Sequence, residues 1–235
     1  MKILAIESSG LTASVAVMTT EDLIGEYTLN CKKTHSQTLM PLIEQLNKDI
    51  DLTLKDIDAI AISEGPGSFT GLRIGAATAK GLAFSLNIPI LSVSSIDGLA
   101  NNILCEHSII CPIMDAKRNQ IYTALYKREK GQLNKITDSK VIDIETLIEE
   151  LKTYDQQVTF NGDGVEVYKE IIEQSSLLSV FAPKNLMKQK ASSIGDLALS
   201  DYGLVKKVKA NDFVPVYLRK SQAEREYEQR IKNND

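Results

Sequence analysis

The stretch Ser63-Glu64-Gly65-Pro66-Gly67-Ser68-Phe69-Thr70-Gly71-Leu72-Arg73-Ile74-Gly75 decides how this chain folds. A short apolar run with β-branched residues precedes it at 58–62 and is typical of a buried strand. Residues 71–86 follow it and are rich in Ala and Leu, which favours a helix. The stretch is therefore predicted to join a strand to a helix through a Gly-Pro-Gly turn.

We predict that this is a structural turn, formed by Gly65, Pro66, Gly67, Ser68 and Thr70. The glycines permit backbone angles closed to other residues, the proline stiffens the turn, and either hydroxyl can cap the helix. A helix N-terminus could also hold a phosphate. However, the spacing G-x-G-x-x-x-G is one residue too long for a dinucleotide fingerprint, and no Gly-Lys-Ser/Thr follows. We therefore favour a tight turn over a phosphate site.

The predicted helix has a small residue at every fourth position: Gly71, Gly75, Ala79 and Ala83. Residues four apart lie on the same side of a helix, so these four form one stripe along it. Glycine inside a helix costs about 0.5–1 kcal/mol relative to alanine, so a helix that carries Gly75 and Gly81 gains something in return. The expected gain is the close approach of another backbone. That backbone could belong to the chain's own sheet or to another protein, and the spacing leaves both open.

The composition is ordinary for a globular protein with one large domain or two small ones: 235 residues, 43% hydrophobic and 25% charged. The net charge is −4, and no stretch has a dense Lys/Arg cluster. Phosphate neutralisation supplies most of the affinity for nucleic acid. The chain is therefore not expected to hold nucleic acid by itself.

The three cysteines, Cys31, Cys105 and Cys111, lack a C-x-x-C spacing and are odd in number, which indicates free thiols in a reducing compartment. Only four apolar residues stand between Lys2 and Glu7, too few for a signal peptide. No apolar run approaches the ~18–20 residues of a membrane-spanning helix. A cytoplasmic protein without membrane contact is expected.

The hydrophobic pattern predicts one order of elements twice. The first half has the order β-β-β-α-β-α, with strands at 2–6, 13–18, 23–29, 58–62 and 88–93 and helices at 36–47 and 71–86. The second half repeats it more faintly, with strands at 109–114, 121–127, 139–142 and 157–160, helices at 144–151 and 165–174, and then a helix at 192–202 and a strand at 214–218. We therefore predict an α/β fold of two related lobes, 1–104 and 105–218, and a charged tail at 219–235. The helix at 192–202 could pack back on the first lobe.

Few residues suggest catalysis. Glu7 and Asp115 end the first strands of the two lobes and could face one cleft, where paired carboxylates can hold Mg²⁺ or act as acid and base. We favour a turn or capping role, because Ser8 and Ala116 follow them where glycine would let phosphates approach. His35 has no second metal ligand three or four residues away, and no hydrolase elbow is present. No catalytic or metal-binding residue is predicted.

Five stretches resemble the bacterial TsaB (YeaZ) family: ILAIESS at 3–9, HSQTLMPLI at 35–43, GPGSFTGLRIG at 65–75, PIMDAKR at 112–118 and VYLR at 216–219. The resemblance implies two ribonuclease-H-like lobes of the actin/Hsp70-like ATPase superfamily. It also implies a non-catalytic scaffold subunit of the complex that adds threonylcarbamoyl to N6 of adenosine 37 in tRNAs reading ANN codons. The catalytic paralogue, TsaD, has a His-x-x-x-His metal motif, whereas the matching helix here offers His35 and Leu39. The resemblance therefore implies neither a metal nor a cofactor for this chain.

The resemblance also implies the partners. Members of the family dimerise, or pair with TsaD, through helices of the first lobe; the ATPase TsaE joins the assembly, TsaC supplies threonylcarbamoyl-adenylate, and tRNA is bound only through the complex. We accordingly expect the helices at 36–47 and 71–86 to pack against a partner. The expected contact residues are His35, Leu39, Met40, Ile43, Gly71, Leu72, Gly75 and Ala79. Glu7, Ser8 and Asp115 would be the remnant of a nucleotide site.

Two other functions stay open from the sequence. One is an active nucleotide-dependent phosphotransferase of the actin-like class, using Glu7 and Asp115, which would bind Mg-ATP as an isolated chain. The other is a metallopeptidase, which would contain stoichiometric zinc or iron.

Overall fold

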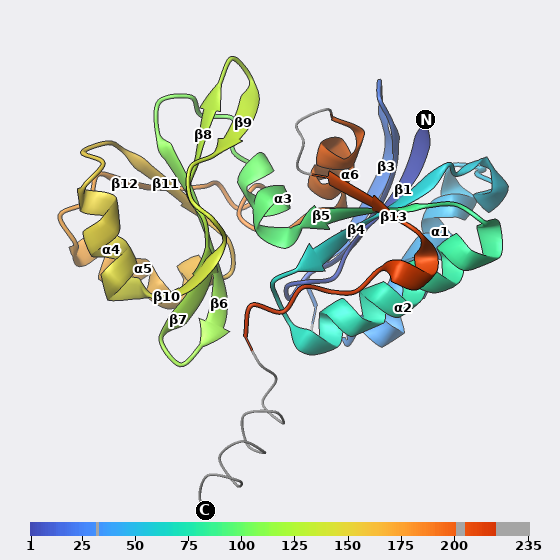
Figure 1. The fold of residues 1–235 in the computed structure, drawn as a ribbon, viewed down its shortest axis with the longest axis horizontal. Coiled ribbons are helices and arrows are strands. Elements are labelled where there is room, and N and C mark those ends of the chain that lie inside the picture. Colours follow the sequence, from blue (N-terminus) through green and yellow to red (C-terminus); the bar gives the residue numbers. More distant parts are fainter. Residues whose placement is uncertain (32, 201–204, 220–235) are drawn as a thin grey trace, which may run out of the picture.

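Two lobes, each built on one β-sheet, lie side by side in the computed structural model, which describes residues 1–31, 33–200 and 205–219 (Figure 1). The first lobe has a six-stranded sheet and the second a seven-stranded one. The predicted α/β fold of two lobes is therefore confirmed. Within the described ranges, no helix is long and apolar enough to cross a membrane.

The first sheet has the order β13-β5-β4-β1-β2-β3. Its strands are β1 (Lys2–Glu7), β2 (Ala13–Thr19), β3 (Leu23–Leu29), β4 (Ala59–Gly65), β5 (Ile90–Ser94) and β13 (Val205–Val208). β1, β4 and β5 are parallel, so their carboxyl ends lie at the same edge of the sheet. β2 and β3 form the predicted antiparallel meander on β1. Ile3 to Ile6 of β1 are completely buried, as expected for a central strand covered on both faces.

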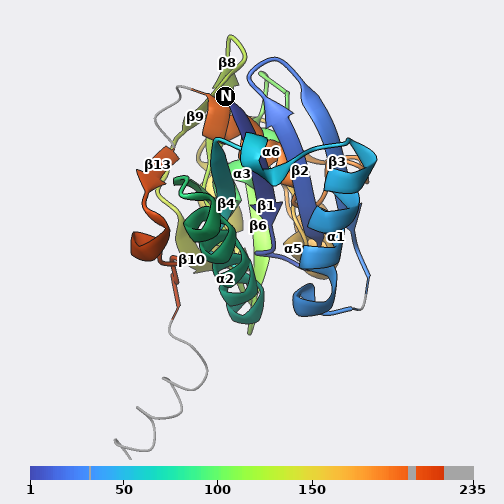
Figure 2. The same cartoon turned by 90° about the vertical axis from the view of Figure 1, so that its right-hand side faces the viewer.

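Helices cover both faces of this sheet. α1 (His35–Asp49) and α2 (Phe69–Leu86) lie side by side on one face, and α6 (Ala191–Leu199) lies on the other (Figure 2). α1 buries its predicted stripe of Leu39, Leu42, Ile43 and Leu46 in the core on its side of the sheet. A 3₁₀ turn (Leu54–Asp56) leads from α1 into β4.

The second sheet has the order β10-β7-β6-β11-β12. Its strands are β6 (Ile109–Lys117), β7 (Gln120–Thr123), β10 (Lys140–Asp143), β11 (Val158–Asn161) and β12 (Ser179–Phe181), and α4 (Ile144–Lys152) and α5 (Gly164–Gln174) pack against them. Leaving out β13 of the first sheet and the hairpin strands at 126–129 and 132–135 of the second, both sheets have the strand order third-second-first-fourth-fifth. The two lobes are therefore related by duplication, as the repeated order of elements predicts.

A hairpin interrupts the second repeat, so the single strand predicted at 121–127 is wrong. The chain divides there into β7 and β8 (Tyr126–Glu129), and β8 pairs with β9 (Gln132–Lys135). Arg128 is buried and donates hydrogen bonds to the carbonyl oxygens of Ile103, Gly131 and Asn101. These bonds tie the hairpin to α3 (Ser95–Asn101), which connects the two lobes.

The chain returns to the first lobe near its end. α6 packs against β1 and β2, as the sequence allowed, and β13 pairs with β5. The second lobe therefore ends before α6 and not at 218. The strand predicted at 214–218 is wrong, because Pro215 has no N–H to donate and Val216 alone donates from its backbone to Glu64 (2.7 Å). Of the predicted tail, only Arg219 lies in the described part of the chain.

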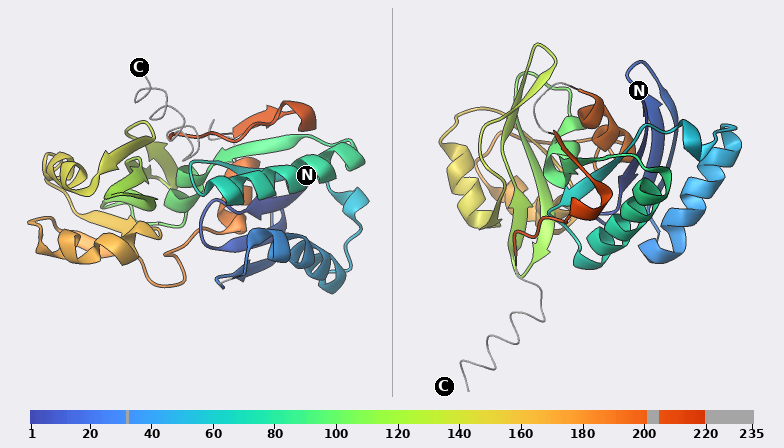
Figure 3. Two further views of the ribbon diagram at one scale, coloured as in Figure 1. Left: turned by 90° about the horizontal axis from the view of Figure 1, so that it is seen from below. Right: turned by 45° about the vertical axis from the view of Figure 1, so that its right-hand side comes forward.

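The last described segment runs from the 3₁₀ turn Ala210–Asp212 alongside α2 toward the second lobe (Figure 3). Phe213 is buried in the first lobe's core, and Lys80 of α2 donates to the carbonyl oxygens of Asn211 and Phe213. We call residues 213–219 the strap, because they link the two lobes across one edge of the cleft.

Candidate functional site: the cleft between the lobes

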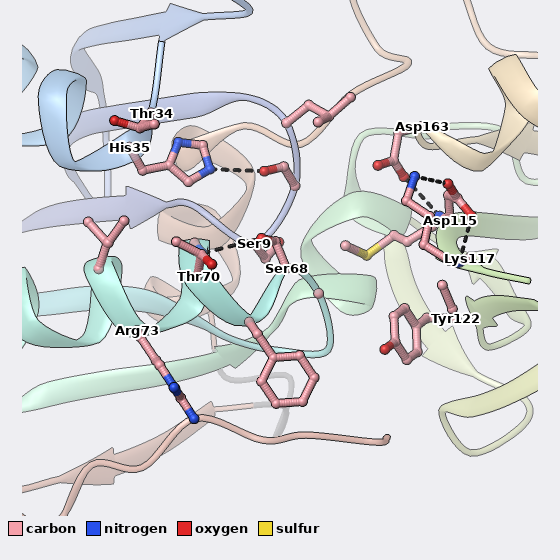
Figure 4. Close-up of a pocket in the computed structure, with 18 of the residues that line it drawn as sticks. Ser9, Thr34, His35, Ser68, Thr70, Arg73, Asp115, Lys117, Tyr122 and Asp163 are labelled. Carbon is pink, nitrogen blue, oxygen red and sulfur yellow. Dashed lines mark hydrogen bonds and ion pairs between the residues drawn. The ribbon is translucent and has the colours of Figure 1, made fainter. Parts of the chain in front are cut away.

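The two lobes enclose a cavity of about 870 Å³ (Figure 4). The first lobe lines it with the β1–β2 turn, the start of α1 and the start of α2. The second lobe lines it with the β6–β7 turn and the start of α5, and Arg219 of the strap also reaches it. Both Gly-x-Gly turns predicted from the sequence stand beside this cavity, because each follows the fourth strand of its lobe.

The glycine turn at the start of α2 closes on its own lobe. Gly65 has a φ of +115°, and a Cβ on Gly67 would lie 2.3 Å from the carbonyl oxygen of Ser9. That same oxygen accepts a hydrogen bond from the backbone N–H of Ser68 (2.7 Å). Ser68 is also the N-cap residue, and its hydroxyl accepts from the N–H of Gly71 (3.3 Å). The turn therefore supports the β1–β2 loop, the structural role favoured from the sequence.

Glu7 does not face the cavity. Its side chain is completely buried, and its Oε1 accepts hydrogen bonds from both the N–H and the hydroxyl of Ser9 (2.6 Å each). Its Oε2 has no partner among the described residues. Burial raises the pKa of Glu7 from 4.5 to about 7, against the lowering effect of the Ser9 hydrogen bonds. Glu7 fixes the loop that Ser68 contacts.

Asp115 does line the cavity, so the expectation that Glu7 and Asp115 face one cleft is wrong for Glu7. The Asp115 carboxylate accepts from the backbone N–H of Lys117 (2.8 Å) and pairs with its ammonium (2.5 Å). Asp163, from the Gly-x-Gly turn at 162–164, accepts from the N–H of Asp115 (3.2 Å). Burial, followed by the charge of Asp115, raises the pKa of Asp163. The sequence analysis missed Asp163, although the turn that contains it was predicted.

His35 also lines the cavity, and its Nε2 lies 2.9 Å from the carbonyl oxygen of Gly10. Leu39, four residues after His35, is buried in the first lobe's core. Within residues 1–31, 33–200 and 205–219, no group of three or more His, Cys, Asp or Glu side chains could hold a metal ion.

The small-residue stripe of α2 serves the chain's own packing. A Cβ on Gly71 would lie 2.1 Å from the carbonyl oxygen of Ser8, and one on Gly75 would lie 2.2 Å from the Ser8 hydroxyl. That hydroxyl donates to the carbonyl oxygen of Gly71 (3.0 Å). Ser8 therefore contacts the helix. The close approach predicted from the glycines occurs, but it occurs within the first lobe.

Six of the eight residues expected at the partner contact lie inside the described chain and not on its surface. Those six are Leu39, Ile43, Gly71, Leu72, Gly75 and Ala79. Only Met40 is exposed, and His35 is half-buried. The outward faces of the same two helices carry different residues.

Gly71→Ala and Gly81→Ala are expected to change the free energy of unfolding in opposite directions. The first places a methyl group against the backbone of Ser8 and should destabilise the protein by about 1–3 kcal/mol. The second should stabilise it by roughly 0.5–1 kcal/mol, because nothing lies within 4 Å of a Cβ at Gly81. Urea unfolding of both variants would measure the two effects. Equal effects would contradict the packing assigned to Gly71.

Comparison with known families points to one pathway. Residues 23–227 match the family model described as "TsaD: tRNA N6-adenosine threonylcarbamoyltransferase". The chain is 36% identical over 230 residues to the tRNA threonylcarbamoyladenosine biosynthesis protein TsaB of Bacillus subtilis (strain 168), a match covering 95% of this chain and 96% of that protein. It is 27% identical over 226 residues to the protein of the same name from Escherichia coli (strain K12), covering 95% and 96%.

Solved structures show the same likeness. A Pseudomonas aeruginosa protein described as similar to peptidase YEAZ superposes with a TM-score of 0.79 at 27% identity, covering 93% of this chain and 99% of that one. YeaZ from Pseudomonas aeruginosa superposes with a TM-score of 0.75 at 25% identity, covering 92% and 99%. The ethanolamine utilization protein EutJ from Carboxydothermus hydrogenoformans, at 11% identity and a TM-score of 0.52, shares the fold.

Proposed function

We propose that this chain, which belongs to the TsaB family of tRNA threonylcarbamoyladenosine biosynthesis proteins, is the non-catalytic subunit that supports a TsaD-like catalytic relative. The observation that carries the proposal is the closed turn at the start of α2. The carbonyl oxygen of Ser9 accepts from the backbone N–H of Ser68, the N-cap residue of α2, and Glu7 is completely buried below the loop. A helix N-terminus is a favourable place for a phosphate only when its amides can reach one. The cleft is thus organised by contacts within the protein.

The test is reconstitution of the reaction with tRNA, threonylcarbamoyl-adenylate from TsaC, the TsaD-like subunit and the TsaE-like ATPase. With this chain present, adenosine 37 should be modified; without it, modification should fall at least tenfold. The chain alone should modify no tRNA. Full modification without the chain, or turnover by the chain alone, would contradict the proposal. We also propose a cytoplasmic location, because the proposed substrate is tRNA.

The partner surface that we propose is the outward side of α1 and α2. Ala77, Gly81 and Phe84 are exposed and are spaced three or four residues apart, so they form one face of α2. Met40 is exposed on α1 (48%), and Phe84 is the most exposed aromatic side chain in the described structure (70%). Ala77 and Gly81 are small, so a second helix can approach this face closely. The same face can pair two copies of this chain when the catalytic relative is absent.

Phe84→Glu is expected to weaken binding to the TsaD-like subunit at least tenfold, because a charge would replace the large exposed aromatic residue of this face. Leu104→Glu is the matched control, since Leu104 is 75% exposed on the segment that follows α3, away from this face. Titration by isothermal calorimetry would compare the two variants with the unmodified chain. If both variants bound with unchanged affinity, α2 would not be the partner surface.

A further inference from the structure

The mouth of the interlobe cleft is positively charged, although the whole chain has a net charge of −4. The cavity is lined by five basic side chains from both lobes and the strap: Lys33, Arg73, Lys117, Arg118 and Arg219. Three acids, Asp115, Asp163 and Glu166, line it as well. The fold therefore gathers cations that are far apart in the sequence.

Two of the three acids are paired locally. Asp115 pairs with Lys117, and Glu166 pairs with Lys188 (2.8 Å) from outside the cavity lining. The third acid, Asp163, accepts a hydrogen bond from the backbone N–H of Asp115 (3.2 Å). Within the described ranges, by contrast, Lys33, Arg73 and Arg118 have no carboxylate within 4.0 Å of their charged groups. The rim therefore presents uncompensated positive charge to the solvent.

The arrangement of these cations is built into the fold. Arg118 stands in the β6–β7 turn, between Lys117 and Asn119, and all three have φ values of 59° to 64°. Such angles are unfavourable for residues other than glycine, so the surrounding structure holds this turn in place. Arg219 of the strap donates to the carbonyl oxygens of Ala116 and Lys117 at the same turn.

An aromatic pair stands on the first-lobe side of the same mouth. Tyr217 of the strap stacks on Phe69, with ring centroids 4.5 Å apart and planes 4° from parallel. The guanidinium of Arg73 lies 6.0 Å from the Phe69 ring. Tyr217 is 36% exposed. Cations beside exposed aromatic rings are the combination that proteins use to bind single-stranded nucleic acid, since the rings contact bases and the cations contact phosphates.

We propose that the mouth of the cleft contacts the sugar–phosphate backbone of RNA, and that this RNA is the tRNA substrate of the assembly. The inference rests on the proposed function, which brings tRNA to this chain. The cations come from four separate segments along the rim. This spread favours binding of a chain of phosphates over binding of one small anion. In addition, the backbone N–H of Ser68, the N-cap residue of α2, already donates to the carbonyl oxygen of Ser9. The contact is weak for the isolated chain and adds to that of the catalytic relative.

The test measures binding of the full chain to a fluorescently labelled tRNA by anisotropy over a series of salt concentrations. Arg73→Gln/Arg118→Gln should weaken binding at least tenfold at low salt. The slope of log K against the logarithm of the salt concentration should also decrease in magnitude by about 1.4–1.8, which is the contribution of two phosphate contacts. Both arginines are exposed, so the double variant should fold normally. Lys55→Gln/Lys130→Gln removes the same charge from exposed positions outside the cleft and should leave the slope unchanged.

Three outcomes would overturn the proposal: an unchanged slope in the arginine variant, an equal loss in the lysine control, or displacement of the tRNA by inorganic phosphate or Mg-ATP at equimolar phosphate. The last would mean that the cleft takes a small phosphate compound. The reconstituted tRNA modification assay distinguishes failure of the RNA-contact proposal from failure of the proposed function. If the chain still supported modification while the arginine variant bound tRNA normally, only the RNA contact would be wrong.

Discussion

When the pH is raised from 5 to 8, the free energy of unfolding should fall less for Glu7→Gln than for the unmodified protein. The two decreases should differ by roughly 3 kcal/mol. The reason is the complete burial of Glu7, which raises its pKa from 4.5 to about 7. Since the folded state binds this proton more tightly than the unfolded chain, the Glu7 contribution is most favourable below pH 4.5. It is lost as the pH rises to about 7. A shift of that size corresponds to roughly 3 kcal/mol.

Urea unfolding at pH 5, 6, 7 and 8 would measure the difference. Glutamine keeps an oxygen that can accept from Ser9 but never ionises, so the variant should lack this part of the pH dependence. Asp163 is the charged group that raises the Glu7 pKa further, and its own raised pKa acts in the same direction in both proteins. Glu44→Gln, on the exposed side of α1, is the control and should follow the unmodified protein. Parallel curves for Glu7→Gln and the unmodified protein would show that folding does not raise the pKa of Glu7.

Most of the fold could be predicted from the sequence, because its signals are local. The apolar stripe of α1, the buried run of β1 and the glycine turn before α2 each indicate an element within a few residues. The failures concern elements that depend on distant partners. β13, with the sequence Val-Lys-Lys-Val, is too short and polar to be recognised alone, and it exists because β5 offers an edge. Likewise, β8 turns away from β7 because β9 and α3 hold it.

The candidate site was harder to predict than the fold. Gly71 and Gly75 indicated a close backbone approach, but the sequence could not say that Ser8 makes it. Nor could spacing reveal the cationic mouth, since Arg73 and Arg118 stand in different lobes. The absence of basic residues close together in the chain predicted that it would not hold nucleic acid by itself. Tertiary structure, not local density, decides where charges gather.

The joint between the lobes leads to the other large effect, because a buried ion pair holds α3 to the second lobe. Asp97 of α3 accepts from the hydroxyl of Tyr126 (2.5 Å) and from the ammonium of Lys135 (2.8 Å). The side chain of Asp97 is 5% exposed and that of Lys135 is 24% exposed. On the other side, Asn101 of α3 donates to Asp196 of α6 (2.8 Å), which packs on the first sheet. α3 thus touches both lobes.

Asp97→Ala is expected to destabilise the protein by about 2–4 kcal/mol, since it leaves the buried Tyr126 hydroxyl without its acceptor and the half-buried Lys135 ammonium with only the Ser139 hydroxyl (2.9 Å). Asp97→Asn should cost less, because its amide oxygen can still accept from Tyr126. Urea unfolding would give both values, and Asp138→Ala, at an exposed position of the same lobe, should stay within about 0.5 kcal/mol of the unmodified protein. A double-mutant cycle with Tyr126→Phe should then give a coupling energy of about 0.5–3 kcal/mol. If Asp97→Ala cost no more than the control, the pair would not hold α3 in place, and the angle between the lobes would depend instead on Arg128 and the strap.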